Sequence, residues 1–209
     1  MWARDSAPPI LAWRNALRRR VRSRVRSKDR PSTSVICENT EVRNEEAFLI
    51  YSVEKLRQYT DRICLCLDKL TPEQVWARGS ANENAVGNLV LHLAGNVRQW
   101  IGYGIAGREN IRDRDSEFDA RQGTVALGEL LRSAVGEAVA VIEALTPERL
   151  AQTTNVQGYD VTVLQAVYHV VEHFSHHAGQ VLFATKMLTG DGLGFYRHLQ
   201  SASHGERTP

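Results

Sequence analysis

Four of the seven histidines lie within nine residues of one another, at His169, His173, His176 and His177. If this stretch is helical, residues four apart differ by about 40° in direction and about 6 Å in height. His169, His173 and His177 would then form one stripe. The pair His173 and His177 could direct two imidazoles at one point, as metal sites on helices do, so the spacing favours a divalent metal ion.

A third imidazole for such a site is His92, which lies between two leucines in an earlier apolar segment. A neighbouring helix could supply it to the pair His173 and His177. Spacing alone leaves two alternatives open. A buried histidine is often a hydrogen-bonded core residue, and His169 is either a rival ligand or a group that orients the site. His176 lies about 100° around the helix from His177, which makes it a neighbour and not a ligand.

The elements that would position these histidines are helical, because apolar residues recur every three or four positions over four long segments. The expected helices cover about 45–70, 86–105, 125–145 and 163–188. Gly95 lies inside the second, where glycine costs about 1 kcal/mol relative to alanine, and this indicates a close approach by another helix. No segment shows convincing two-residue alternation, so the predicted fold class is all-α, an antiparallel four-helix bundle.

Three expected helix starts carry a threonine that is followed by proline at the next position or by glutamine three positions later. Residues 71–74 (Thr-Pro-Glu-Gln) predict a capping box, with proline at the first helical position. Residues 146–149 (Thr-Pro-Glu-Arg) repeat the pattern after the third helix, which suggests two similar helical hairpins. Thr162 and Gln165 predict a capping box at the start of the fourth helix, and Gly190 marks its end.

The charge is distributed unevenly along the 209 residues. Residues 1–31 contain ten Lys or Arg and two Asp, a net charge of +8, whereas the remainder contains 16 basic and 22 acidic residues, a net charge of −6. We therefore expect three parts: a disordered basic extension (1–42), the bundle (43–200) and a C-terminal tail (201–209). Nucleic-acid binding, organelle targeting and contact with an anionic membrane are alternative roles for the extension. A nucleic-acid partner is unfavoured, because the negative charge of the body gives no further support to binding a polyanion.

Composition excludes several classes of protein. No apolar run approaches the roughly 18 residues of a membrane-spanning helix, so no membrane partner is expected. The sparse set Cys37, Cys64 and Cys66 argues against a disulfide framework and for a reducing compartment, which predicts a cytoplasmic location. Cys64 and Cys66 would lie about 160° apart around a helix, so they are expected to be core or boundary residues and not joint metal ligands.

Two segments carry a resemblance to a known family: residues 88–96 (Asn-Leu-Val-Leu-His-Leu-Ala-Gly-Asn) and 169–180 (His-Val-Val-Glu-His-Phe-Ser-His-His-Ala-Gly-Gln). They resemble the DinB-like (YfiT-related) metal-binding four-helix proteins. Residues 112–118 and 193–196 are similar to an uncharacterised branch of that superfamily. The resemblance covers roughly residues 45–199. It implies a four-helix bundle and, position by position, the metal ligands His92, His173 and His177.

Such a site predicts chemistry at an open metal position. Three imidazoles suit zinc or nickel and lower the pKa of a coordinated water or thiol. The resemblance implies a transferase that moves a low-molecular-weight thiol, as cosubstrate, to an electrophilic small molecule. The alternatives are a metal-dependent hydrolase and a metal-binding stress-response or binding module without turnover; in the module, a fourth protein ligand such as His169 would close the site.

Two amides are predicted to lie near the metal. Asn96 follows His92 by four residues and Gln180 follows His177 by three, so both could hold substrate or orient the site, although ordinary interhelical hydrogen bonding explains them equally well. No carboxylate is well placed to act as a general base, because Glu172 turns away from its neighbour His173, and this mildly disfavours hydrolysis. A homodimer is compatible with this type of bundle.

Overall fold

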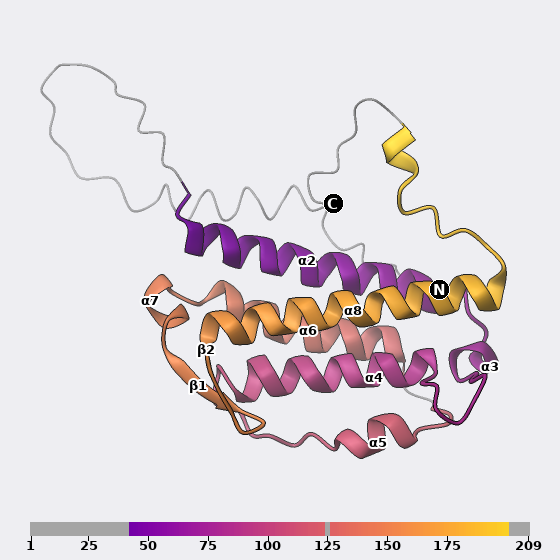
Figure 1. The fold of residues 1–209 in the computed structure, drawn as a ribbon, viewed down its shortest axis with the longest axis horizontal. Coiled ribbons are helices and arrows are strands. Elements are labelled where there is room, and N and C mark those ends of the chain that lie inside the picture. Colours follow the sequence, from indigo (N-terminus) through magenta and orange to yellow (C-terminus); the bar gives the residue numbers. More distant parts are fainter. Residues whose placement is uncertain (1–41, 124–125, 201–209) are drawn as a thin grey trace, which may run out of the picture. The chain divides into compact units, whose positions relative to one another are not determined.

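The computed structural model describes residues 42–123 and 126–200. Its long helices are α2 (Asn44–Leu67), α4 (Val86–Val97), α6 (Leu127–Glu143) and α8 (Val163–Thr189), and a π-helix, η1 (Arg98–Tyr103), continues α4 (Figure 1). The four-helix bundle predicted from the apolar periodicity is therefore confirmed. The basic extension lies outside the described residues, apart from Val42, and so does the tail 201–209.

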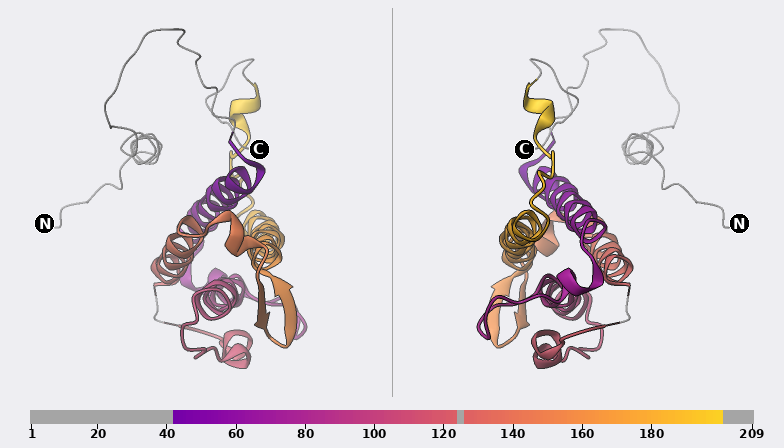
Figure 2. Two further views of the ribbon diagram at one scale, coloured as in Figure 1. Left: turned by 90° about the vertical axis from the view of Figure 1, so that its left-hand side faces the viewer. Right: turned by 90° about the vertical axis from the view of Figure 1, so that its right-hand side faces the viewer.

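The helices surround one core in a defined order. α2 packs between α6 and α8, and α4 packs against the same two helices on the opposite side (Figure 2). α2 and α8 run in one direction, whereas α4 and α6 run in the other (Figure 1). Because α4 and α6 are consecutive yet point the same way, the chain between them must return along the bundle. We call residues 104–123 the crossover segment; it contains the short helix α5 (Arg114–Asp119), which packs against α4.

The second connection contains a β-hairpin that the sequence did not predict. After α7 (Pro147–Leu150), β1 (Thr153–Val156) pairs antiparallel with β2 (Tyr159–Thr162), with Thr153 opposite Thr162. The turn residues Gln157 and Gly158 have φ values of 54° and 82°, the left-handed conformation that a two-residue hairpin turn needs. Strands of four residues are too short to display a recognisable alternation.

The predicted helix starts are confirmed. Thr71 caps α3 (Pro72–Val75) by accepting a hydrogen bond from the Gln74 N–H, and the Gln74 side chain accepts one from the Thr71 N–H. Thr162 and Gln165 form the same capping box at the start of α8. α8 ends at Gly190, whose φ of 73° allows the left-handed termination of a helix. The last described element is a 3₁₀ turn, η2 (Arg197–Gln200).

The core is built from the apolar stripes of the four helices. Its largest fully buried side chains include Phe174 of α8, Leu56 and Ile63 of α2, and Leu131 of α6. Cys64 and Cys66 are buried free thiols, and burial raises the pKa of both, as expected for packing residues and not for nucleophiles. None of the helices described is long and apolar enough to cross a bilayer.

Candidate metal centre

Three imidazoles from two helices converge inside the bundle. His92 lies on α4, and His173 and His177 lie one turn apart on α8. One nitrogen from each ring lies within 4.8 Å of the others. His92 Nε2 and His173 Nε2 lie 2.9 Å apart. Nitrogens bound to one tetrahedral ion at about 2.0–2.1 Å lie roughly 3.4 Å apart, so small side-chain adjustments would bring all three onto one ion.

Burial keeps the two imidazoles of α8, His173 and His177, neutral. It lowers the pKa of His173 to about 3, and the surrounding His177, His92, His169 and Arg112 contribute in the same direction. Burial also lowers the pKa of His177, although a hydrogen bond with Gln180 opposes the shift. A protonated imidazole cannot bind a metal ion, so these two side chains have the protonation state that ligands require at neutral pH.

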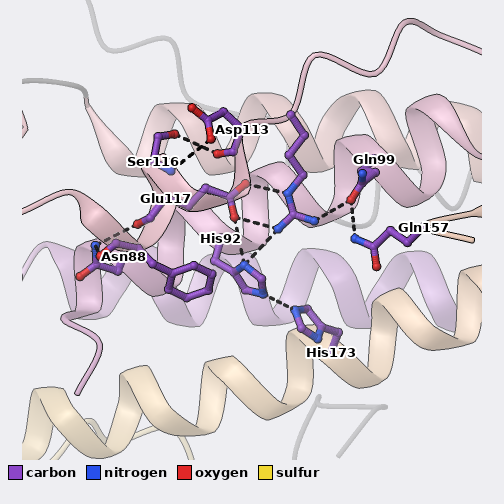
Figure 3. Close-up of polar contacts among 10 residues, drawn as sticks. Asn88, His92, Gln99, Asp113, Ser116, Glu117, Gln157 and His173 are labelled. Carbon is purple, nitrogen blue, oxygen red and sulfur yellow. Dashed lines mark hydrogen bonds and ion pairs between the residues drawn. The ribbon is translucent and has the colours of Figure 1, made fainter. Parts of the chain in front are cut away.

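Two of the rings have a partner on the nitrogen that faces away from the cluster. Gln180 Oε1 lies 2.7 Å from His177 Nδ1, and Glu117 Oε2 lies 3.0 Å from His92 Nδ1. Figure 3 shows Glu117 and His173 on opposite sides of the His92 ring. When Nδ1–H donates to these oxygens, the lone pair of Nε2 points into the cluster, which is the usual arrangement around metal-binding histidines.

Glu117 is in turn held by Arg112 in a bidentate ion pair. Arg112 Nε and Nη2 each lie 2.7 Å from one oxygen of the Glu117 carboxylate, and both side chains are buried, with 5% and 9% exposure. Burial alone would raise the pKa of Glu117, but the hydrogen bonds and charges of Arg112 and His92 lower it below the ordinary value. Glu117 is therefore an ionised carboxylate behind His92.

The crossover segment is tied to α4 at the level of this pair. Asn88 Nδ2 donates to the backbone oxygens of Glu117 and Ala120, each at 2.9 Å, and Arg78 Nη2 donates to the oxygen of Phe118. A Cβ atom on Gly95 would overlap the Glu117 carboxylate. The close approach predicted at Gly95 is thus made by a side chain of α5, and not by the backbone of a long bundle helix.

The remaining predicted residues, Asn96 and His169, differ in their surroundings. Asn96 is buried, and its Oδ1 accepts no hydrogen bond from the described residues. The His169 ring contacts that of Trp100 at a centroid distance of 4.0 Å, tilted by 37°, and it is 5.5 Å from the ring of His173. Within the described part of the chain, His169 does not join the group of converging nitrogens. His176 is exposed on the outer side of α8.

The cluster opens onto a cleft of about 640 Å³. Beside the three histidines, the cleft is lined by Asn84, Arg114, Asp115, Phe118 and Asp119. The Phe118 ring lies 4.8 Å from that of His92, and the Arg114 guanidinium lies over the face of the Phe118 ring at 4.9 Å. The site therefore combines converging nitrogens with space for a small molecule and with side chains of both charges.

Sequence reasoning missed Arg112 and Glu117 as site residues. Both belong to residues 112–118, whose only signal in the sequence is their similarity to an uncharacterised branch of the DinB-like superfamily. A loop and a six-residue helix have too little periodicity to show which side chains turn inward. The strongest available signal was Gly95, an interior helical glycine, but this residue does not indicate what fills the space above it.

Comparison with known proteins supports the fold. A family model described as a protein of unknown function (DUF1572) matches residues 44–197. The structure of YfiT from Bacillus subtilis, described as a probable metal-dependent hydrolase with an unusual four-helix bundle topology, superposes with a TM-score of 0.58 and 17% identity, covering 79% of this chain and 95% of YfiT. No curated protein sequence matches the chain.

Two further structures show the same likeness. A DinB-like protein, YjoA from Bacillus subtilis, has a TM-score of 0.55 and 20% identity, and the match covers 70% of this chain and 96% of that one. A conserved protein from Enterococcus faecalis has a TM-score of 0.57 and 15% identity, with 68% and 97% covered. At these identities the similarity establishes the fold alone.

Proposed function

The chain belongs to the DUF1572 family and has the DinB-like fold, and from this premise we propose that it is a divalent-metal enzyme acting on a small molecule at His92, His173 and His177. The observation that carries the proposal is the convergence of three ring nitrogens at the edge of a cleft. No fourth His, Cys, Asp or Glu of the described residues joins that group. A structural metal site is usually closed by four protein ligands, whereas a catalytic one keeps an exchangeable position.

The residues present fit a metal such as zinc or nickel. Three imidazoles are suitable donors, and Glu117 and Gln180 orient two of the rings. A divalent ion held there supplies Lewis acidity, which lowers the pKa of a small coordinated molecule. Arg114 and the carboxylates Asp115 and Asp119 present both charges to whatever occupies the cleft.

The first candidate reaction is transfer of a low-molecular-weight thiol to an electrophilic small molecule. The family resemblance supports it. The arrangement of Glu117 also supports it, because this buried carboxylate is engaged by Arg112 and by the rear nitrogen of His92 and so is not free to act as a base in the cleft. A thiol, with an ordinary pKa near 8.5, needs less help from a base than water does.

Hydrolysis is the second candidate, and a specific observation favours it. Asp115 and Asp119 line the cleft next to the histidines, where sequence reasoning expected no useful carboxylate. Either could take a proton from a water molecule if the substrate brought the two close enough. The description of YfiT as a probable metal-dependent hydrolase points the same way.

Metal content tests the proposal directly. Wild type, His173→Ala and His176→Ala are purified without a metal-binding tag, reconstituted with zinc or nickel, and analysed for metal per chain. His176 is the matched control, since it is an exposed histidine on the same helix. We expect about one equivalent in wild type and in His176→Ala, and loss in His173→Ala. Absence of metal from reconstituted wild type would overturn the proposed function.

Thiol binding then separates the candidate reactions. The cobalt- or nickel-substituted protein is titrated with bacillithiol or mycothiol, and the S-methyl derivative of each serves as control. A sulfur-to-metal charge-transfer band that appears only with the free thiol supports thiol transfer. Absence of this band, together with hydrolysis of an activated ester that depends on His173, supports the hydrolase. Metal binding without either result supports a binding module.

A further inference from the structure

We propose that Arg112 and Glu117, on the crossover segment, are positioning residues that determine which nitrogen of His92 is available to a metal ion. This inference rests on the metal site proposed above. It concerns the rear of the His92 ring, which faces away from His173 and His177. Two side chains of opposite charge meet there at one ring nitrogen.

Both side chains lie at the same distance from that nitrogen. Glu117 Oε2 and Arg112 Nη2 are each 3.0 Å from His92 Nδ1. A guanidinium can only donate a hydrogen bond and an ionised carboxylate can only accept one, whereas Nδ1 of a neutral imidazole is either a donor or an acceptor. The two contacts are therefore mutually exclusive in any one tautomer of His92.

Each tautomer has a consequence at Nε2, the nitrogen of His92 that faces His173. If Nδ1–H donates to Glu117, the lone pair of Nε2 is available and His92 can bind metal. If Nδ1 accepts from Arg112, the proton is on Nε2. His92 then donates it to His173 Nε2, 2.9 Å away, and both nitrogens are unavailable to metal. The first arrangement is competent to bind a metal ion, and the second is a closed, metal-free arrangement.

The surroundings favour the metal-competent choice, because Arg112 Nη2 lies closer to Glu117 Oε2, at 2.7 Å, than to His92 Nδ1, at 3.0 Å. Arg112 Nε and Nη2 each lie 2.7 Å from a Glu117 oxygen, and Nη1 donates to Gln99 Oε1 at 2.8 Å. Gln99 Oε1 also accepts from Gln157 in the hairpin turn, so the position of the guanidinium is set from three segments (Figure 3). Gly95 leaves the space in which the carboxylate lies.

Such a buried pair needs an explanation beyond stability. Replacing a buried ion pair with apolar residues is often neutral or stabilising, because desolvation offsets much of the attraction between the charges. Here the pair lies directly behind a candidate ligand and presents it with one acceptor and one donor. Selection of the His92 tautomer is a role that an apolar replacement could not fill.

Glu117→Gln tests the inference, with Glu137→Gln as matched control. Glu137 also pairs with two arginines, Arg98 and Arg108, but it has no contact with the histidine cluster. Zinc affinity is measured by competition with a chromogenic chelator, and the visible spectrum of the cobalt form reports ligand geometry. We expect Glu117→Gln to weaken zinc binding by about 10- to 100-fold and to change the cobalt spectrum. Glu137→Gln should match wild type in both.

A second measurement uses wild type, so the inference can be tested even if the Glu117→Gln variant misfolds. Nitrogen-15 NMR of labelled histidine distinguishes the two tautomers, and we expect His92 in the metal-free protein to carry its proton on Nδ1. A proton on Nε2, or unchanged zinc affinity in folded Glu117→Gln, would overturn the inference while leaving the proposed function intact. Failure of wild type to bind zinc would overturn both.

Discussion

Each histidine of the cluster has a different environment on its outer side. His92 meets a buried carboxylate and His177 an exposed amide, while the ring of His169 lies beside that of His173. What the three candidate ligands share is proximity to one another. Three imidazoles this close can coexist only if they are neutral or share a cation, since protonation of one disfavours protonation of the next.

Burial of His173 and His177, together with their closeness to other histidines, predicts an acid-sensitive fold for the metal-free protein. The folded pKa of His173 is about 3, and that of His177 is lowered, whereas an unfolded histidine titrates near 6.5. Below pH 6.5 the unfolded chain binds protons that the folded chain does not. The free energy of unfolding should therefore fall as the pH drops from 6.5 towards 3, by at most about 1.4 kcal/mol per pH unit for each such histidine.

Urea unfolding at pH 7.5 and 5.5 checks this prediction above the range in which carboxylates titrate. His173→Gln removes one of the responsible groups and should lose less stability between the two pH values than wild type does. His176→Gln serves as the exposed control and should behave like wild type. Equal pH dependence in wild type and His173→Gln would contradict the prediction.

The three candidate ligands could be predicted from the spacing of residues in the sequence, but the side chains that hydrogen-bond to them could be predicted only in part. A spacing of four on a helix brings His173 and His177 together, and a spacing of three places Gln180 against His177, because helical geometry is known in advance. Glu117 lies 25 residues from His92 along the chain. A contact across that separation depends on the path of a loop, which no local pattern determines.

At the scale of elements, the site depends on how α5 approaches α4. Helix propensity alone would make Gly95→Ala favourable by about 1 kcal/mol. The added methyl group would instead overlap the Glu117 carboxylate. We expect Gly95→Ala to destabilise the protein by about 1–3 kcal/mol, the usual effect of overpacking, and to weaken zinc binding by displacing Glu117.

Gly136→Ala is the matched control for this substitution. Gly136 is also inside a long helix, α6, but it is exposed, and among the described residues no atom other than its chain neighbours and the nearby backbone of α6 lies within 4 Å of where its Cβ would be. Urea unfolding should show that Gly136→Ala gains about 0.5–1 kcal/mol. A similar gain for Gly95→Ala would show that the crossover segment does not lie tightly on α4.

Prediction of the elements succeeded where the pattern was long and failed where it was short. Twelve or more residues of apolar periodicity identified α2, α4, α6 and α8, and side-chain chemistry identified the capping boxes at Thr71 and Thr162. The hairpin of β1 and β2 has four residues in each strand, and α5 has six. Their conformations depend on contacts with other elements, such as the hydrogen bond from Thr154 Oγ1 to the Gly104 oxygen.

For the whole molecule, the directions of the helices explain why the site can form. α4 and α8 are neighbours that run antiparallel, so His92 meets His173 and His177 across their interface. Amphipathic stripes predicted four helices around a core, but not that α2 and α4 would lie diagonally opposite. The order of helices around a bundle depends on loop paths. The homodimer and the cytoplasmic location stay predictions.

Because the proposed ion would join α4 to α8, metal binding should stabilise the entire fold. A ligand that binds only the folded state at 100 times its Kd adds about 2.7 kcal/mol to the free energy of unfolding. We expect zinc to raise the Tm of wild type and of His176→Ala in a concentration-dependent manner, and to leave that of His173→Ala unchanged. Calorimetry checks this, and an equal shift in all three proteins would indicate non-specific binding.

The long chain separation between the candidate ligands has a consequence for biosynthesis. His92 precedes His173 by 81 residues, and two of the three imidazoles belong to α8, the last long helix described. On the ribosome, the emerging chain carries His92, and then the Arg112–Glu117 pair, well before either of the other two. A nascent or truncated chain that lacks α8 has a single imidazole to offer, so acquisition of the ion would follow synthesis of the whole bundle and would discriminate finished molecules from unfinished ones.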